Sequence, residues 1–294
     1  MAARLLPPLK CVTFNLLHGG PFSGLRGSAQ ELHHRLEIAA AELLLLNADI
    51  IGLQEASTSP GRGNVAARLA ARLGYHSVYA PATCRLFPHE RVNAAIARVL
   101  KFTEGPAILS RFPILAWQAQ VLPRGGRLTE PRVLLYAMLQ TPWGQLQVAS
   151  THTSGTLLQH RKVAEVLRRR RALPLLVMGD FNALEDSRAM ATLTHEAGFR
   201  DAFRSIHPAA AGFTCDQALH APTPTVSQRV DYILVLPGTK APGRICASQV
   251  ILNTPGRLPD GRILWPSDHY GVLAEVEVFS PTVETHREAT TLPH

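Results

Sequence analysis

Cysteine is scarce in this sequence: only four cysteines occur among 294 residues. They lie far apart and show none of the close spacings of a zinc site or a disulfide framework, which argues against both. We interpret them as buried free thiols, the state expected in a reducing compartment, and therefore expect a cytoplasmic protein. The four are Cys11, Cys84, Cys215 and Cys246.

Long apolar runs and linkers are also missing. The most apolar long segment, residues 38–53, is interrupted by Glu42, Asn47 and Asp49, so it is not a membrane span. The apolar stretch at the N-terminus is too short for a secretory signal. No Gly/Ser linker or charge block divides the chain, and we expect one domain over residues 1–279. We expect residues 280–294, which have no apolar periodicity, to form a disordered tail.

Acidic and aromatic residues are in short supply. Lys and Arg outnumber Asp and Glu by 30 to 22, a net charge of +8 that suits an anionic partner. Aromatic residues make up only 6% of the chain, too few to suggest stacking on nucleic-acid bases. The basic run 168–171 ends an expected helix, where it complements the helix dipole as solvated surface. The charge thus favours a phosphate-bearing partner and does not single out nucleic acid.

Short strand-like runs alternate with helix-like stretches along the chain. Helices that separate groups of hairpin-like strands predict two sheets packed face to face with helices outside. The expected strands are 11–14, 49–53, 75–80, 106–109, 114–121, 133–140, 146–150, 173–178, 230–236 and 270–278. The expected helices are 28–46, 62–73, 157–171 and 187–197.

The motif Gly179-Asp180-Phe181-Asn182 follows a continuous apolar run. Glycine allows the backbone to turn as it leaves the strand, so Asp180 and Asn182 can present a carboxylate and an amide to one opening. Asp and Asn also commonly cap a following helix. The motif by itself fits either role.

The motif Ser267-Asp268-His269 precedes the expected strand 270–278. His269 can face a substrate while a carboxylate elsewhere fixes its tautomer and raises its basicity. Asp231, at the start of strand 230–236, is a candidate for that carboxylate. A solvent-exposed histidine is the alternative interpretation of His269.

Three further polar residues follow apolar runs: Asn15, Glu55 and His152. The carboxylate oxygens of Glu55 are hard ligands of the kind that Mg²⁺ or Mn²⁺ prefers, although Glu55 could also be an ordinary carboxylate at a strand end. His152 could donate a proton to a leaving oxygen while His269 activates water. The sequence has no zinc cluster, nucleophile elbow or phosphate-binding loop that would indicate another chemistry.

Seven short motifs in this order resemble the endonuclease/exonuclease/phosphatase superfamily, the DNase I-like fold. The resemblance runs from residue 13 to residue 269. The motifs are Thr13-Phe14-Asn15, Gly52-Leu53-Gln54-Glu55, Glu104-Gly105-Pro106-Ala107-Ile108-Leu109-Ser110-Arg111, Ser150-Thr151-His152, Gly179-Asp180-Phe181-Asn182, Arg229-Val230-Asp231-Tyr232 and Ser267-Asp268-His269.

The resemblance implies a four-layer α/β sandwich with two central, mostly antiparallel sheets and an active site at one edge. It implies a divalent cation, Mg²⁺ or Mn²⁺, with Glu55 as the principal ligand. Asn15 and Asp268 are expected nearby in the environment of the metal.

The resemblance also assigns the catalytic groups. Asp180 and Asn182 would orient the attacking water and the phosphoryl oxygens. His269, paired with Asp231, would be the general base or a phosphate-stabilising imidazolium. His152, steadied by Glu104, would protonate the leaving group.

Departures from the family pattern favour a two-histidine branch. His152 stands where apurinic/apyrimidinic endonucleases usually carry a tyrosine, and it is similar to DNase I, bacterial sphingomyelinases and many uncharacterised bacterial members. Met178 and Ala183-Leu184, on either side of the Gly-Asp-Phe-Asn motif, depart from inositol polyphosphate 5-phosphatases. The disulfides of secreted DNases are not evident.

The expected activity is that of a metal-dependent phosphodiesterase or nuclease, with in-line attack by activated water. A sphingomyelinase-like phospholipid substrate, or a small phosphodiester or phosphomonoester, is the alternative. No aromatic hairpin suggests stable membrane insertion. An inactive binding scaffold is disfavoured because Glu55, Asp180 and His269 are all present. The sequence leaves open the substrate, endo or exo action, the number of metals and the oligomeric state.

Overall fold

The computed structural model describes residues 6–17, 29–60, 62–82, 102–124, 131–169, 174–238 and 243–278. Its first sheet has the strand order β12-β15-β1-β2-β5-β4, with β3 paired to β2. Only β1 and β2 are parallel neighbours, and the other pairs are antiparallel. The strands are β1 (Leu9–Asn15), β2 (Ile50–Ser59), β3 (Gly63–Asn64), β4 (His76–Tyr79), β5 (Thr103–Ser110), β12 (Arg244–Ile251) and β15 (Gly271–Glu277).

The second sheet has the order β10-β11-β9-β8-β7-β6. Here β8 and β9 are the parallel pair. The strands are β6 (Ile114–Val121), β7 (Val133–Thr141), β8 (Gly144–His152), β9 (Leu175–Asp180), β10 (Arg200–Asp201) and β11 (Asp231–Leu236). A separate hairpin joins β13 (Gly256–Arg257) to β14 (Ile263–Leu264).

Successive residues of a strand point to opposite faces of its sheet, and in these strands both faces are apolar. One face of each sheet therefore packs against the other sheet, and the opposite face packs against helices. In β11, Ile233 faces the other sheet and Leu234 faces the helices, and both are buried. Strands β2 and β9 approach each other closely, because a Cβ on Gly52 would lie 2.5 Å from the Cβ of Met178. Glycine at this position therefore lets the sheets meet directly beneath the site.

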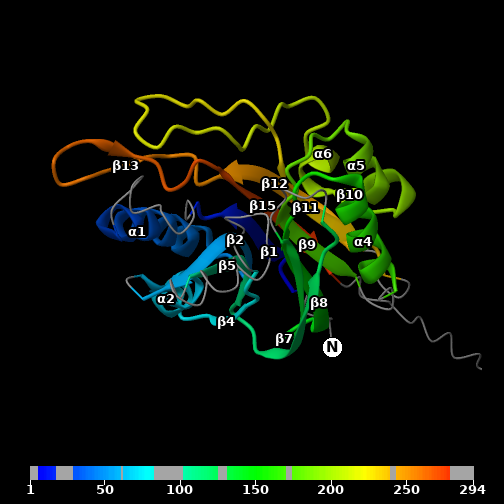
Figure 1. Ribbon diagram of the computed structural model, residues 1–294. Coiled ribbons are helices and arrows are strands. Elements are labelled where there is room, and N and C mark those ends of the chain that lie inside the picture. Colours follow the sequence, from blue (N-terminus) through cyan, green and yellow to red (C-terminus); the bar gives the residue numbers. More distant parts are fainter. Residues whose placement is uncertain are drawn as a thin grey trace, which may run out of the picture.

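Helices cover the outer faces of the sandwich (Figure 1). Helices α1 (Ala29–Leu46) and α2 (Val65–Leu73) pack on the first sheet, and α4 (Leu157–Arg168) and α5 (Arg188–Ala191) on the second. The short helix α6 (Ala202–Ile206) lies against β11 and β12. This arrangement confirms the expected α/β sandwich with two mostly antiparallel sheets and helices outside.

Several boundaries differ from the sequence predictions. Strand β2 does not end at Leu53 but continues to Ser59 through a bulge. The expected helix 187–197 is divided into α5 and a π-helical turn at Thr192–Glu196. Helix α4 ends at Arg168, and residues 170–171 of the basic run lie outside the described residues.

The described cysteines are unpaired, but only Cys11 is fully buried. Cys215 and Cys246 are half-buried, so the expectation of buried thiols was wrong for these two. Cys84 and the expected tail 280–294 lie outside the described residues. Within the described part of the chain, no helix has the length and apolar character to cross a membrane.

Candidate active site

The polar residues singled out in the sequence gather at one edge of the sandwich. Asn15 ends β1, His152 ends β8 and Asp180 ends β9, while Asp231 begins β11. The carboxyl ends of the parallel pair β8 and β9 lie side by side, and His152 is the register partner of Asp180. Residues that are far apart in the sequence therefore lie close together at this edge of the sheets.

Glu55 reaches the site because β2 is bulged. The pairing of β2 with β5 shifts register between Leu53 and Ala56, and Glu55 adopts a left-handed backbone conformation with φ of 52°. A bulge leaves one residue unpaired and re-aims its side chain. Glu55 is thus directed at the site from the middle of a strand. The sequence had suggested a position at the end of that strand.

Asn15 connects two carboxylates. Its Nδ2 lies 3.0 Å from Oδ2 of Asp180 and 3.3 Å from Oε1 of Glu55. Its Oδ1 accepts a hydrogen bond from the backbone N–H of Leu17 at 3.0 Å. The amide of Asn15 therefore donates to Glu55 and Asp180, which holds these two side chains together.

His152 is enclosed by polar groups. Its Nε2 lies 3.3 Å from Oδ2 of Asp180 and 2.8 Å from Nδ2 of Asn182. The same amide of Asn182 donates to the carbonyl of Thr153 at 2.9 Å. The Nδ1 of His152 lies 2.8 Å from the guanidinium of Arg132 and 4.0 Å from Oε1 of Glu55. His152 is therefore fixed in orientation by contacts on both ring nitrogens.

His269 forms the second imidazole arrangement. Its Nδ1 lies 2.9 Å from Oδ2 of Asp231, and its Nε2 lies 3.8 Å from Oδ2 of Asp180 and 3.5 Å from Sγ of Cys215. Burial alone lowers the pKa of His269, but the carboxylate of Asp231 outweighs it and holds that pKa well above the ordinary value. The expected pairing of His269 with Asp231 is present as a direct contact.

Asp180 lies between the two histidines and in a charged neighbourhood. Burial, followed by the nearby carboxylate of Asp231, raises the pKa of Asp180 to about 7. Burial also raises the pKa of Asp268. Oδ1 of Asp231 is buried and has no hydrogen-bond partner. Asp231 thus repels Asp180 in a buried site that also holds Glu55 through Asn15. A divalent cation would offset this repulsion, and carboxylate oxygens are the hard ligands that suit Mg²⁺ or Mn²⁺.

Asp268 is placed by its neighbour Ser267. The hydroxyl of Ser267 donates to the backbone carbonyl of Asn15 at 2.7 Å and lies 3.3 Å from Oδ1 of Asp268. Ser267 Oγ also accepts from the backbone N–H of His269 at 3.2 Å. One hydroxyl therefore joins the end of β1 to the loop that carries Asp268 and His269.

A second group of possible metal ligands consists of Asp180, Asp231 and His269, whose ligand atoms all lie within 4.8 Å of one another. The Nδ1 of His269 is already engaged by Asp231 in this group. We therefore interpret these three residues as an arrangement for proton transfer and not as the main cation site.

Arg132 is a site residue that the sequence analysis missed. One guanidinium nitrogen contacts Nδ1 of His152 and lies 3.9 Å from Oε1 of Glu104. Glu104 was expected to steady His152, and Arg132 forms the link between them. The only available signal was the position of Arg132 just before an apolar strand, which is also common for solvated arginines.

Cys215 was also missed as a site residue, although its thiol lies next to His269. It belongs to a loop that pairs with both Gln228 and His269. Its sequence context offers no signal, because neighbouring residues carry no motif.

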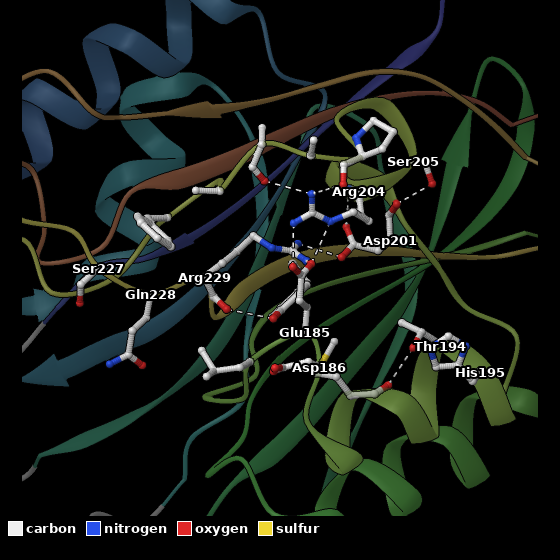
Figure 2. A pocket seen from close by; sticks show the side chains of 18 residues that line it. Glu185, Asp186, Thr194, His195, Asp201, Arg204, Ser205, Ser227, Gln228 and Arg229 are labelled. Carbon is white, nitrogen blue, oxygen red and sulfur yellow. Dashed lines mark hydrogen bonds and ion pairs between the residues drawn. The ribbon is translucent and has the colours of Figure 1, made fainter.

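A cavity of about 1030 Å³ is lined by residues between Leu184 and Arg229, together with Tyr232. Figure 2 shows Arg204 and Arg229 in its wall, both paired with Glu185. Arg229 also contacts Asp201 at 2.8 Å. Both arginines are thus paired with carboxylates, which leaves neither of them free to bind a phosphate.

A model of the endonuclease/exonuclease/phosphatase family matches residues 12–269. The chain belongs to this family. The match begins at β1 and ends at His269, so it includes every site residue described above. Members of the family are generally hydrolytic on phosphoesters, which makes phosphoester hydrolysis the general class of activity that membership supports.

Solved structures agree on the fold. A family protein from Bacteroides thetaiotaomicron is 17% identical, with a TM-score of 0.72 over 94% of this chain and 100% of its own. A mannosyl-6-phosphatase from the same organism is 17% identical, with a TM-score of 0.70 over 92% of this chain and 99% of its own. The human nocturnin catalytic domain, solved with a bound sulfate anion, is 20% identical, with a TM-score of 0.64 over 92% of this chain and 93% of its own.

No curated protein sequence matches the chain significantly. The structural similarities are all too low in identity to carry a substrate from one protein to another. They establish the DNase I-like fold, and the substrate has to be argued from the site.

Proposed function

We propose that this protein is a divalent-metal-dependent phosphodiesterase that uses two histidines. The observation that carries the proposal is the position of Asp180, whose Oδ2 lies 3.3 Å from Nε2 of His152 and 3.8 Å from Nε2 of His269. Two imidazoles thus flank one buried carboxylate, and each is oriented by a different partner, Arg132 or Asp231. In-line attack on a phosphodiester requires groups on opposite sides of phosphorus.

Glu55, Asn15 and Asp268 would hold the cation. Bound there, Mg²⁺ or Mn²⁺ would neutralise charge on the phosphoryl oxygens in the transition state. Glu55 is partly accessible, with 21% of its side chain exposed. A phosphate ester would approach the site from the side on which Glu55 is exposed.

The protein residues divide the remaining work. Asp180 accepts a hydrogen bond from Asn15 and orients the attacking water, while the amide of Asn182, which contacts Nε2 of His152 and the carbonyl of Thr153, helps to orient His152. His269, held by Asp231, takes up the proton of that water or stabilises the phosphoryl charge. His152, held by Arg132, lies on the other side of Asp180 and protonates the leaving oxygen.

Nucleic acid is one candidate substrate. The net charge of +8 would attract it, and phosphodiester cleavage by this set of residues needs no contact to a base. A phospholipid or a small phosphodiester would use the same groups, and a phosphomonoester would have a similar charge distribution. The site residues thus favour cleavage of a phosphoester bond, and they do not distinguish between the substrates that contain one.

The first test is turnover of bis-p-nitrophenyl phosphate with Mg²⁺, with Mn²⁺ and with EDTA. We expect turnover that requires the cation and is lost in a His269→Ala variant, whereas the exposed His76→Ala variant serves as a matched control. Metal-independent turnover, or full activity of His269→Ala, would contradict the proposal. p-Nitrophenyl phosphate, measured in parallel, separates diester from monoester specificity.

The class of substrate is identified by assaying a panel of phosphoesters under the same conditions. Supercoiled plasmid, single-stranded DNA, sphingomyelin vesicles and inositol phosphates cover the candidate classes. Conversion of plasmid to the nicked form would establish endonuclease action, and mononucleotide release from linear DNA would establish exonuclease action.

A further inference from the structure

One buried arginine lies behind the site without facing it. Arg35 belongs to α1, and its residue is only 7% exposed. Its guanidinium donates to three backbone carbonyls: to Leu16 at 2.8 Å, to Leu17 at 2.6 Å and to Pro266 at 3.3 Å. An arginine fork can satisfy several carbonyls at once in a fixed geometry, which a lysine cannot reproduce.

These carbonyls belong to the two segments that carry the expected cation ligands. Leu16 and Leu17 directly follow Asn15, and Pro266 lies two residues before Asp268. Arg35 therefore connects the segment after β1 to the loop before β15. The hydroxyl of Ser267, which donates to the carbonyl of Asn15, is a second connection between the same segments.

The contact with Leu17 also bears on the orientation of Asn15. Leu17 has a φ of 46°, a left-handed conformation that is strained for a residue other than glycine. In this conformation its N–H donates to Oδ1 of Asn15, and its carbonyl accepts from Arg35. The guanidinium thus holds the residue that turns the amide of Asn15 towards Glu55 and Asp180.

We propose that Arg35 is a positioning residue that sets the spacing of Asn15 and Asp268 for a divalent cation. The inference rests on the proposed function, since it assumes that these residues hold the metal. It adds a residue from outside the motif set, on helix α1, which covers the first sheet.

The hydrogen bonds of Arg35 and its positive charge predict opposite effects on metal binding when Arg35 is replaced. Burial lowers the pKa of Arg35 to about 10, so the guanidinium remains protonated at neutral pH. A buried positive charge close to a cation site repels the cation, and its removal on that ground alone would strengthen metal binding. If Arg35 acts by position, its removal weakens binding instead.

The test is the affinity for Mn²⁺, measured by isothermal titration calorimetry on full-length wild type, Arg35→Lys and Arg35→Met. The temperature is kept below the lowest melting temperature of the set. Arg204→Met is the matched control, because Arg204 (Figure 2) also donates to three backbone carbonyls, those of His207, Pro208 and Ala210, and none of these belongs to a segment that carries an expected cation ligand.

We expect Arg35→Lys and Arg35→Met to bind Mn²⁺ about 10–100-fold more weakly than wild type, the usual effect of losing a residue that orients metal ligands. Arg204→Met should lower the melting temperature and leave the affinity unchanged. If Arg35→Met does not fold, Arg35→Lys decides the question, because it keeps the charge and loses the fork.

Affinity for Mn²⁺ equal to or tighter than wild type in folded Arg35→Lys would overturn the inference while leaving the proposed function intact. Absence of Mn²⁺ binding to wild type would instead overturn the proposed function. Equal weakening in Arg204→Met would show that the effect is a general loss of stability.

Discussion

The Nδ1 atom of His269 lies 2.9 Å from Oδ2 of Asp231, and the other oxygen of the same carboxylate is buried without a hydrogen-bond partner. Asp231 also raises the pKa of its neighbour Asp180. A carboxylate that is half satisfied and repelled by a second carboxylate does little for folding. Its arrangement is better explained by the imidazole that it orients.

Replacing Asp231 should therefore separate activity from stability. We expect Asp231→Asn to lower kcat/KM by about 10²–10⁴-fold, because His269 loses the charge that stabilises its imidazolium form. The melting temperature should stay the same or rise, since a buried charge is removed. Kinetics and thermal melts on the same preparation test both parts, and a variant that loses activity only in proportion to its folded fraction would refute this assignment.

The two histidines should respond differently to the leaving group. If His152 protonates the leaving oxygen, His152→Ala should lose less activity on bis-p-nitrophenyl phosphate than on a diester with an alkyl alcohol leaving group. A p-nitrophenolate leaves readily without a proton, whereas an alkoxide does not. His269→Ala should lose a similar factor on both substrates. Rates on a matched pair of diesters measure the difference, and equal losses for His152→Ala would reassign its role.

Cation binding should stabilise the folded protein. At a Mn²⁺ concentration about 100 times Kd, the free energy of unfolding should rise by about 2.7 kcal/mol. Glu55→Gln should abolish most of this increase, because it removes the carboxylate that the β2 bulge directs at the site. Thermal melts with and without Mn²⁺ measure it, with the exposed Glu165→Gln as the control. An undiminished increase in Glu55→Gln would exclude Glu55 as a principal ligand.

The pH dependence of stability should include a contribution from His160, which lies on α4 against the ring of Phe181. Burial lowers the pKa of His160, and its Nε2 has no hydrogen-bond partner. The unfolded chain then binds this proton at a higher pH than the folded protein does. The free energy of unfolding should accordingly fall as the pH drops below about 6.5 and towards the lowered pKa of the folded state.

His160→Gln should reduce this acid sensitivity, and His76→Gln, on an exposed residue, should not. Chemical denaturation between pH 5 and pH 8 supplies the comparison. Identical slopes for wild type and His160→Gln would show that other groups set the acid response.

The amino-acid sequence was enough to predict the fold class of this protein and the general class of its activity, phosphoester hydrolysis. Asp180, Asp231 and His269 follow or precede strands whose apolar composition is visible without a structure, and their order along the chain is what resembles the family. Strand ends are where sheets can gather residues that are distant in sequence, so the gathering of these residues could be predicted. The expectations of one domain and of a cytoplasmic location stay predictions.

Tertiary structure alone decided how Glu55 is presented and which residues support the site. The bulge of β2 depends on the pairing of β2 with β5, a contact between strands that the local sequence does not encode. Arg35 and Arg132 carry their contacts over long separations, as in the bond from Arg35 to the carbonyl of Pro266. The sequence does hold one indication of its burial, because Arg35 lies three residues after Leu32 and four before Ala39, both on the apolar face of α1. Its partners are backbone carbonyls, which every residue possesses, so only the fold could identify them.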